Sequence, residues 1–109
     1  MKQIIWLGDS LDRLRAFPSE ARREAGYQLE RVQAGKAPVD RKPMGAIGLG
    51  VSEIRVRVGG AFRVIYLVKY AEAVYVLHAF QKQSRRTSYL DVELARNRFR
   101  ALMRERKRQ

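Results

Sequence analysis

The sequence predicts an α+β fold of order βααβββα, with an antiparallel sheet, a helical hairpin before its last three strands and one C-terminal helix packed on it. Helical spacing of apolar residues over about 20–34 and after Ser88 predicts the longer helices. Strict alternation over 52–58 predicts a strand, and two more apolar strands follow it. This order is expected to place the helices on one face of the sheet and leave part of the other face open.

The first third of the chain predicts a short strand, residues 3–7, and then two helices that form a hairpin. Asp9 or Ser10 can cap the first helix, which runs through Phe17 and is ended by Pro18, because proline disfavours the α conformation in the residue before it. Ser19 can cap the second helix, and Gly35 is a typical stop after it. The apolar residues of the second helix are spaced by four, four and three, which puts them on one face: Ala21, Ala25, Leu29 and Val32.

The middle of the chain predicts a loop and then a three-stranded meander. Residues 36–50 are rich in Gly and Pro and contain two apolar anchors, Met44 and Ile47. The strand over 52–58 is followed by the Gly59-Gly60 pair, which supplies the positive φ of a tight hairpin. The second and third strands are expected over 62–69 and 73–80.

Ser88 is expected to cap the last helix, with Asp91 in a variant of the capping box. The basic tail, about 104–109, has no apolar anchor and is expected to fray. The stripe that would pack this helix on the sheet consists of Val92, Ala95, Phe99, Leu102 and Met103. With 109 residues and no linker or repeat, we expect a single domain over 1–109.

The composition points to a folded basic protein. Lys and Arg number 23 against 11 Asp and Glu, a formal net charge of +12, and 46% of residues are hydrophobic. Such a charge would attract nucleic acid, an anionic membrane or an acidic protein, and charge alone does not choose among them. With no Cys and one His we expect no metal and no cofactor. The N-terminus lacks a signal-peptide pattern and no segment could span a bilayer, so we expect a cytoplasmic protein without membrane partners.

Three arginines are candidates for binding phosphate on the sheet. Arg55 and Arg57 lie on the polar face of the first meander strand, and Arg63 begins the strand paired with it. Across a tight hairpin these like charges come close together and favour an anion among them. The structural alternative is a solvated sheet face whose arginines pair with Glu53. Arg63 is the stronger candidate because it interrupts an otherwise apolar strand.

Other candidates lie on the last two strands and on the segment before the final helix. His78 is flanked by apolar residues and is more often structural than catalytic in such a place. Tyr66 and Tyr89 carry hydroxyls that could position or protonate an oxygen, or could simply pack. The segment before the helix N-terminus is a candidate phosphate loop, or alternatively a solubilising surface loop, and its residues are Lys82, Arg85, Arg86 and Thr87.

The chain resembles the RelE/ParE superfamily of toxins, in particular the phage-derived, HigB-like branch. The resemblance runs over nearly the whole chain, through LRAFP (14–18), SEIRVRVGGAFRVIY (52–66), VLHAFQK (76–82) and TSYLDVELARNRF (87–99). It includes an ELR-like element at Glu53-Ile54-Arg55 and an Arg-x-x-Tyr element at Arg63 and Tyr66. Two departures are Gln83, where relatives often have Lys or Arg, and Ser88, where proline commonly follows the threonine.

The resemblance implies a RelE-like fold and the toxin of a type II toxin-antitoxin system. It implies a metal-independent endoribonuclease that cleaves mRNA on the ribosome to inhibit translation, with a helix-turn-helix antitoxin as partner. Arg63 would hold the scissile phosphate, Lys82 and the loop arginines would stabilise the developing charge, and Tyr89 falls where RelE-like enzymes have a catalytic tyrosine. Because ParE proteins poison DNA gyrase without cleaving RNA, a ParE-like gyrase inhibitor is the alternative.

From these arguments two sets of site residues follow. The expected catalytic residues are Arg63, Lys82, Tyr66, His78 and Tyr89. The expected RNA-binding residues are Arg55, Arg57, Arg85, Arg86 and Thr87.

Overall fold

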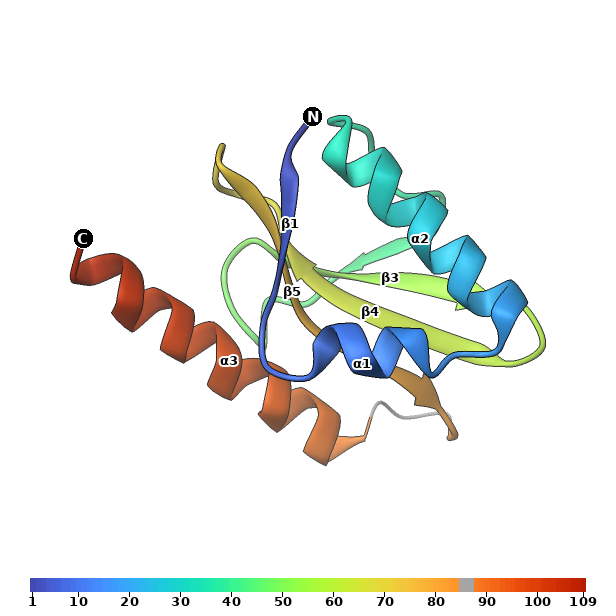
Figure 1. Ribbon diagram of the computed structural model, residues 1–109. Helices are drawn as coiled ribbons and strands as arrows, with labels where there is room; N and C mark the ends of the chain where they lie inside the picture. Colours follow the sequence, from blue (N-terminus) through green and yellow to red (C-terminus); the bar gives the residue numbers. More distant parts are fainter. Residues whose placement is uncertain (85–87) are drawn as a thin grey trace.

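The computed structural model describes residues 1–84 and 88–109 and confirms the α+β fold class (Figure 1). The predicted strands and hairpin helices are all present, with ends that differ from the predicted ones by at most two residues. The elements in chain order are β1 Gln3–Trp6, α1 Ser10–Arg15, α2 Ser19–Gln33, β2 Arg41–Pro43, β3 Val51–Arg57, β4 Ala61–Leu67, β5 Ala73–Lys82 and α3 Tyr89–Lys107. No helix in the described part of the chain is long and apolar enough to cross a membrane.

The sheet is mixed rather than purely antiparallel, with strand order β1-β5-β4-β3-β2. The meander β3-β4-β5 is antiparallel, as predicted, but β1 lies at the edge beside β5 and runs parallel to it. The sequence pattern of β1 predicts a strand but carries no information about its partner or direction. β1 pairs only with residues 73–76, so the second half of β5 extends past it.

The predicted loop over 36–50 contains a short strand that the sequence did not reveal. β2 pairs antiparallel with β3 at the other edge of the sheet, and its three residues are exposed. An exposed strand has no apolar alternation, and Pro43 is tolerated here because β2 is an edge strand. The anchors of the following loop are as predicted, since Ile47 is buried and Met44 packs beside it.

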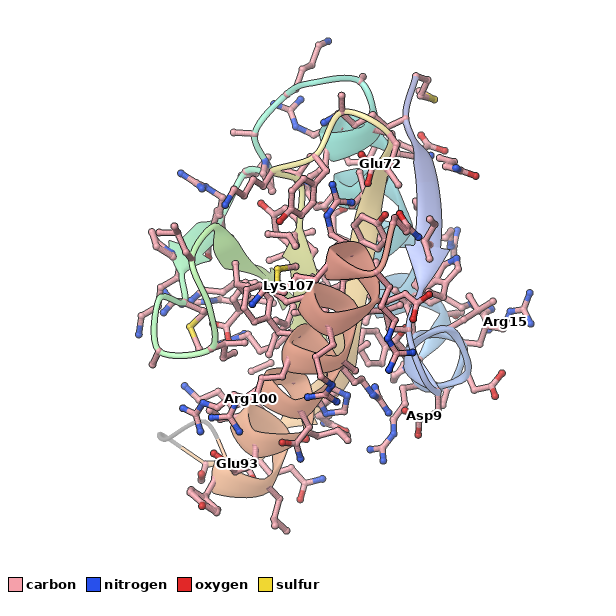
Figure 2. The ribbon with its side chains drawn as sticks, turned by 90° about the vertical axis from the view of Figure 1, so that its left-hand side faces the viewer. Asp9, Arg15, Glu72, Glu93, Arg100 and Lys107 are labelled. Atoms are coloured by element: carbon pink, nitrogen blue, oxygen red, sulfur yellow. The ribbon has the colours of Figure 1, made fainter. Side chains whose placement is uncertain are left out.

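The helices lie on both faces of the sheet, which corrects the prediction of helices on one face. α1 and α2 pack against residues such as Ile54, Val64 and Val76. α3 packs on the opposite face, against residues such as Ile65 and Leu77 (Figures 1 and 2). The apolar stripe of α3 is the predicted one, and it makes a second core in place of an open sheet surface.

A β-bulge in β5 decides which side chains reach which face. Ile65 of β4 is opposite His78, but the next residue, Tyr66, is opposite Val76, so Leu77 is the extra residue. Before the bulge Val76 faces the helical hairpin, and after it Phe80 faces α3. His78 therefore shares the α3 face with Phe80 and not with Val76, whereas simple alternation predicts one face for all three.

The basic tail does not fray where the sequence suggested. α3 continues through Lys107, and Arg106 pairs with Glu72 in the turn before β5. The Arg106 guanidinium also lies over the Tyr70 ring, with its central carbon 3.3 Å from the ring centroid. These contacts hold the last turns of the helix, which apolar periodicity alone could not predict.

Candidate phosphate-binding surface

The register of β3 and β4 brings the predicted cations together on the α3 face of the sheet. Arg55 is directly opposite Arg63, and Arg57 is opposite Ala61, which in turn is opposite Lys82 of β5. A shallow depression of about 450 Å³ lies among these strand ends. Its lining is Arg57, Gly60, Ala61, Arg63, Lys82, Gln83 and Ser84. The described lining thus has three cations and no carboxylate.

A buried carboxylate lies beside this depression. The Glu53 side chain is only 2% exposed, and one of its oxygens, Oε1, lies 3.4 Å from Nε of both Arg55 and Arg63. Arg63 is 5% exposed and Arg55 26%, so the two arginines differ in access to solvent. The structural alternative, in which arginines pair with Glu53, is therefore present for these two residues. Arg57 is more exposed and lies 3.8 Å from the Asp40 carboxylate.

Burial sets the electrostatics of Arg63. Desolvation lowers the pKa of its guanidinium, and the charge of Glu53 opposes that change. Its Nη1 donates to the Phe62 carbonyl over 3.0 Å, whereas its Nε has no hydrogen-bond partner among the described atoms. An arginine stays charged even here. The side chain is thus a fixed cation, held by Glu53 at the wall of the depression.

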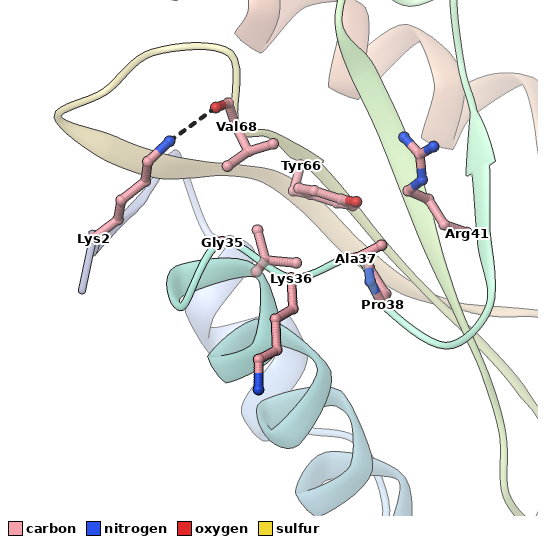
Figure 3. Close-up of a pocket in the computed structure, with 9 residues that line it drawn as sticks. Lys2, Gly35, Lys36, Ala37, Pro38, Arg41, Tyr66 and Val68 are labelled. Atoms are coloured by element: carbon pink, nitrogen blue, oxygen red, sulfur yellow. Dashed lines mark hydrogen bonds between the residues drawn. The ribbon is translucent and has the colours of Figure 1, made fainter.

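Tyr66 lies on the other side of the sheet from Arg63. Its ring is buried among the hairpin residues, and it lines a separate pocket near Lys2 and Arg41 (Figure 3). Burial raises the pKa of its hydroxyl, partly offset by the nearby Arg41. Because successive residues of a strand point to opposite faces, the structure does not bring Tyr66 together with the cations.

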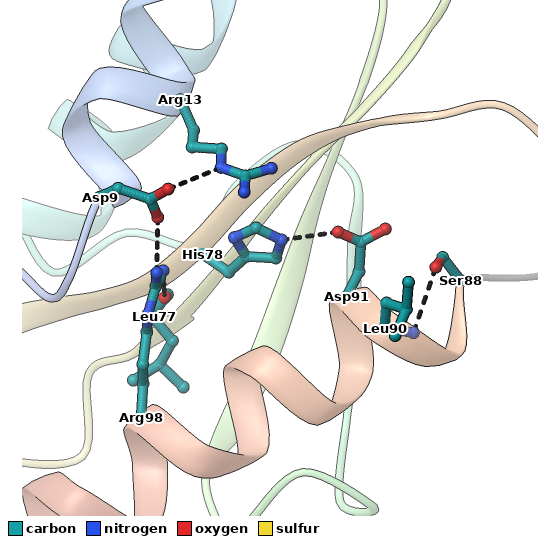
Figure 4. Close-up of polar contacts among 8 residues, drawn as sticks. All are labelled: Asp9, Arg13, Leu77, His78, Ser88, Leu90, Asp91 and Arg98. Atoms are coloured by element: carbon teal, nitrogen blue, oxygen red, sulfur yellow. Dashed lines mark hydrogen bonds and ion pairs between the residues drawn. The ribbon is translucent and has the colours of Figure 1, made fainter.

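His78 is completely buried between β5 and α3. Its Nε2 lies 2.7 Å from Oδ1 of Asp91 (Figure 4). Its ring also stacks on that of Phe80. Burial lowers the pKa of the imidazole, and the Asp91 carboxylate opposes this effect. A neutral ring that donates from Nε2 to Asp91 fits this position. The geometry agrees with the structural reading of His78, which fastens the start of α3 to the sheet.

The start of α3 differs from the predicted capping box. The Ser88 hydroxyl accepts a hydrogen bond from the Leu90 amide, as expected of an N-cap, but the Asp91 carboxylate contacts His78. Tyr89 is the first residue of the helix and is 73% exposed. The remaining candidates of the loop lie outside the described residues: Arg85, Arg86 and Thr87.

Sequence reasoning named Glu53 as a possible partner of the arginines and Asp91 as part of the cap, but it did not predict the contact of Asp91 with His78. It missed the role of Arg98. Arg98 of α3 donates to the Leu77 carbonyl at the bulge and to Asp9 at the start of α1 (Figure 4). The sequence signal that could have revealed this contact is Arg98 itself, an arginine on the apolar side of α3. Among the described residues, no cluster of three or more His, Cys, Asp or Glu side chains could hold a metal ion.

The fold is compatible with the RelE-like α+β topology, and comparison with known families identifies the family. Residues 12–100 match Phage derived protein Gp49-like (DUF891), and the chain belongs to this family. This family lies within the RelE/ParE-like toxin superfamily. No curated protein matches the chain.

Proposed function

We propose that this protein is the toxin of a type II toxin-antitoxin system, of the HigB-like branch, and cleaves mRNA on the ribosome as a metal-independent endoribonuclease. The observation that carries the proposal is the depression lined by Arg57, Arg63 and Lys82 without a carboxylate. Arg63 and Arg57 each contact one carboxylate, Glu53 and Asp40, but neither carboxylate lines the depression. Cations that converge on a surface with no carboxylate in its described lining favour an anion there, and the phosphodiester of RNA is such an anion.

The chemistry follows from what RNA cleavage requires. Attack by the 2′-hydroxyl builds negative charge on the phosphate, and cations fixed before the reaction stabilise that charge. Arg63 is fixed by Glu53 and by the Phe62 carbonyl, so it needs little reorganisation. Lys82 lies at the end of β5, where it can stabilise the charge and the departing 5′-oxygen. RNA is the substrate because the nucleophile is the 2′-hydroxyl.

Tyr66 and His78 take no part in proton transfer in this mechanism. Tyr66 faces the helical hairpin, and the buried His78 ring is turned to Asp91. Tyr89 remains a candidate, because its exposed side chain at the start of α3 is free to approach a substrate. The cognate antitoxin, expected to be a helix-turn-helix protein, is the proposed partner in the cell.

The test is mRNA cleavage on translating ribosomes by purified variants. Lys82→Ala is expected to lower the cleavage rate about 10²–10³-fold, by analogy with the loss of an oxyanion-stabilising donor. Arg57→Ala should have a smaller effect because Arg57 lies at the rim. Arg23→Ala removes the same charge from the exposed side of α2 and is the matched control.

Two results would contradict the proposal. One is Lys82→Ala cleaving at the parental rate while Arg23→Ala does the same. The other is growth arrest on expression with intact mRNA and an induced DNA-damage response, which would support a ParE-like gyrase inhibitor instead.

A further inference from the structure

A second hollow adjoins the cation depression where β5 runs past the end of β1. Because β1 pairs only as far as Val76, the following half of β5 lies at the sheet edge between α1 and the start of α3. A cleft of about 360 Å³ runs along this edge, within the roughly 300–1,000 Å³ that small-molecule clefts occupy. We call it the β5 groove, and its lining includes Phe17, Phe62, Phe80, Gln81, Gln83 and Asp91.

The β5 groove combines an aromatic floor with a hydrogen-bonding rim. The Phe17 and Phe62 rings pack with their centroids 4.8 Å apart, and Phe80 adds a third ring. The amides of Gln81 and Gln83 are exposed, and each offers both donors and an acceptor. The Phe17 and Phe62 rings are tilted by 48°, and all three rings are largely buried beneath the groove. Aromatic side chains beside amide groups suit a nucleobase, since its faces are apolar and its edges polar.

The β5 groove is continuous with the cations. Gln83 lines both the groove and the depression formed by Arg57, Arg63 and Lys82. A small hollow between them is lined by Phe80, Lys82 and Gln83 among others. A nucleotide has the same arrangement, with an anionic phosphate joined through a sugar to a flat base.

We propose that the β5 groove is a nucleobase subsite, which binds the base of a nucleotide next to the phosphate held by the cations. This inference rests on the proposed function and extends it from charge recognition to base recognition. A free sheet edge could also take a strand of a partner protein. The aromatic floor and the shared Gln83 favour the base, because backbone pairing with a strand needs neither.

The test uses short RNA oligomers whose 2′-hydroxyls are methylated, so that they bind without being cleaved. One oligomer carries all its bases and the other, of equal length and charge, has abasic sugars. Measured by fluorescence anisotropy, the parent protein should bind the first about 5- to 150-fold more tightly, since stacking of one base is worth about 1–3 kcal/mol. Gln83→Ala should reduce this ratio, whereas Gln109→Ala, at the exposed C-terminus, should not.

The outcomes separate this inference from the proposed function. If the parent binds both oligomers equally and Lys82→Ala weakens both, the cations bind phosphate and the β5 groove is no base subsite. A second outcome is that the parent prefers the oligomer with bases, but both Gln83→Ala and Gln81→Ala keep the parental ratio of the two affinities. The bases then bind elsewhere, and a strand of a partner protein becomes the better candidate for the groove. If neither oligomer binds at low salt, RNA recognition and the subsite both fail.

Discussion

Glu53 shows at the scale of one residue how the site and the fold depend on each other. A carboxylate buried this deeply is unfavourable unless cations accompany it, and here two guanidinium groups share one of its oxygens. Arg63 therefore neutralises Glu53 as well as lining the depression. The buried pair indicates that Arg63 contributes to the stability of the fold as well as to the depression.

We expect Arg63→Ala to lower the free energy of unfolding by about 3–5 kcal/mol, the usual effect of leaving a buried charge without its partner. Because Arg55 also contacts Glu53, we expect a decrease near the lower end of this range. The double variant Glu53→Gln with Arg63→Met removes both charges and keeps most of the volume, so it should recover part of the loss. Urea unfolding of the three proteins checks this, and a parental midpoint for Arg63→Ala would show that the pair contributes nothing.

Two titrating residues make stability depend on pH in the same direction. Burial lowers the pKa of His78 below its usual 6.5, and hydrogen bonds from Arg13 and Arg98 lower the pKa of Asp9 from 3.8 to about 2. A group with a lowered pKa binds fewer protons when folded, so protons favour the unfolded chain. The free energy of unfolding should thus decrease as pH falls below about 6.5, and again between about 4 and 2.

The check is urea unfolding at a series of pH values from about 8 to 5. His78→Gln keeps a side-chain donor but cannot titrate, so its stability should change much less over this range than that of the parent. A second series from about pH 5 to 2 covers the acid range, where Asp9→Asn should weaken the dependence of stability on pH. Asp9→Asn should leave the range from 8 to 5 unchanged. A parent protein equally stable at both ends of the range would contradict the assignment to His78.

At the scale of elements, Gly8 and Arg98 join three parts of the fold. Gly8 turns the chain from β1 into α1 with a φ of +55°, a conformation that other residues adopt with strain. A Cβ at this position would lie 2.5 Å from the Arg98 guanidinium. Arg98 in turn binds the bulge carbonyl of Leu77, so the turn, the bulge and α3 depend on the same close approach.

A pair of Gly→Ala substitutions tests this arrangement. Gly8→Ala should destabilise the protein by more than about 1 kcal/mol, because it combines backbone strain with a displaced Arg98. Gly26 lies within α2, and a methyl group added there would meet nothing within 4 Å outside the helix backbone. Gly26→Ala should therefore stabilise the protein by about 0.5–1 kcal/mol through helix propensity. Thermal melting measures both changes, and equal effects of the two substitutions would mean that the turn does not need glycine.

At the scale of the whole molecule, the two faces of the sheet differ in role. The helical hairpin covers one side and buries Tyr66 there. On the other side, α3 covers only part of the sheet, and the cation depression opens beyond its N-terminal end. The net charge of +12 attracts a polyanion to the molecule as a whole, whereas Arg57, Arg63 and Lys82 form a defined cluster around one depression.

The salt dependence of RNA binding should report this difference. For single strands the logarithm of the affinity falls with the logarithm of salt, with a slope of about −0.7 for each phosphate neutralised. Lys82→Ala should make the slope smaller by about 0.7, whereas Arg23→Ala should leave it unchanged despite the same loss of charge. Anisotropy titrations over a range of salt measure both slopes. Equal changes in the two variants would indicate diffuse attraction without a defined site.

The sequence by itself determined the elements, because their signals are local. The alternation of β3, the glycines after it and the helical stripes of α2 and α3 each involve neighbours in the chain, and the structure confirms them. It also predicted that Arg55, Arg57 and Arg63 would share a face, since a tight hairpin leaves little choice of register. The family resemblance came from the same local motifs.

Only the tertiary structure decided the partners. β1 could have paired with any strand, and its parallel position beside the first half of β5 leaves the second half of β5 at the sheet edge. The bulge at Leu77 reverses the faces of the residues after Val76, so a period of two predicts the wrong surroundings for His78. The buried position of Glu53 depends on the opposite strand and on two cations at once. Such features arise from contacts between distant segments, and no local pattern encodes them.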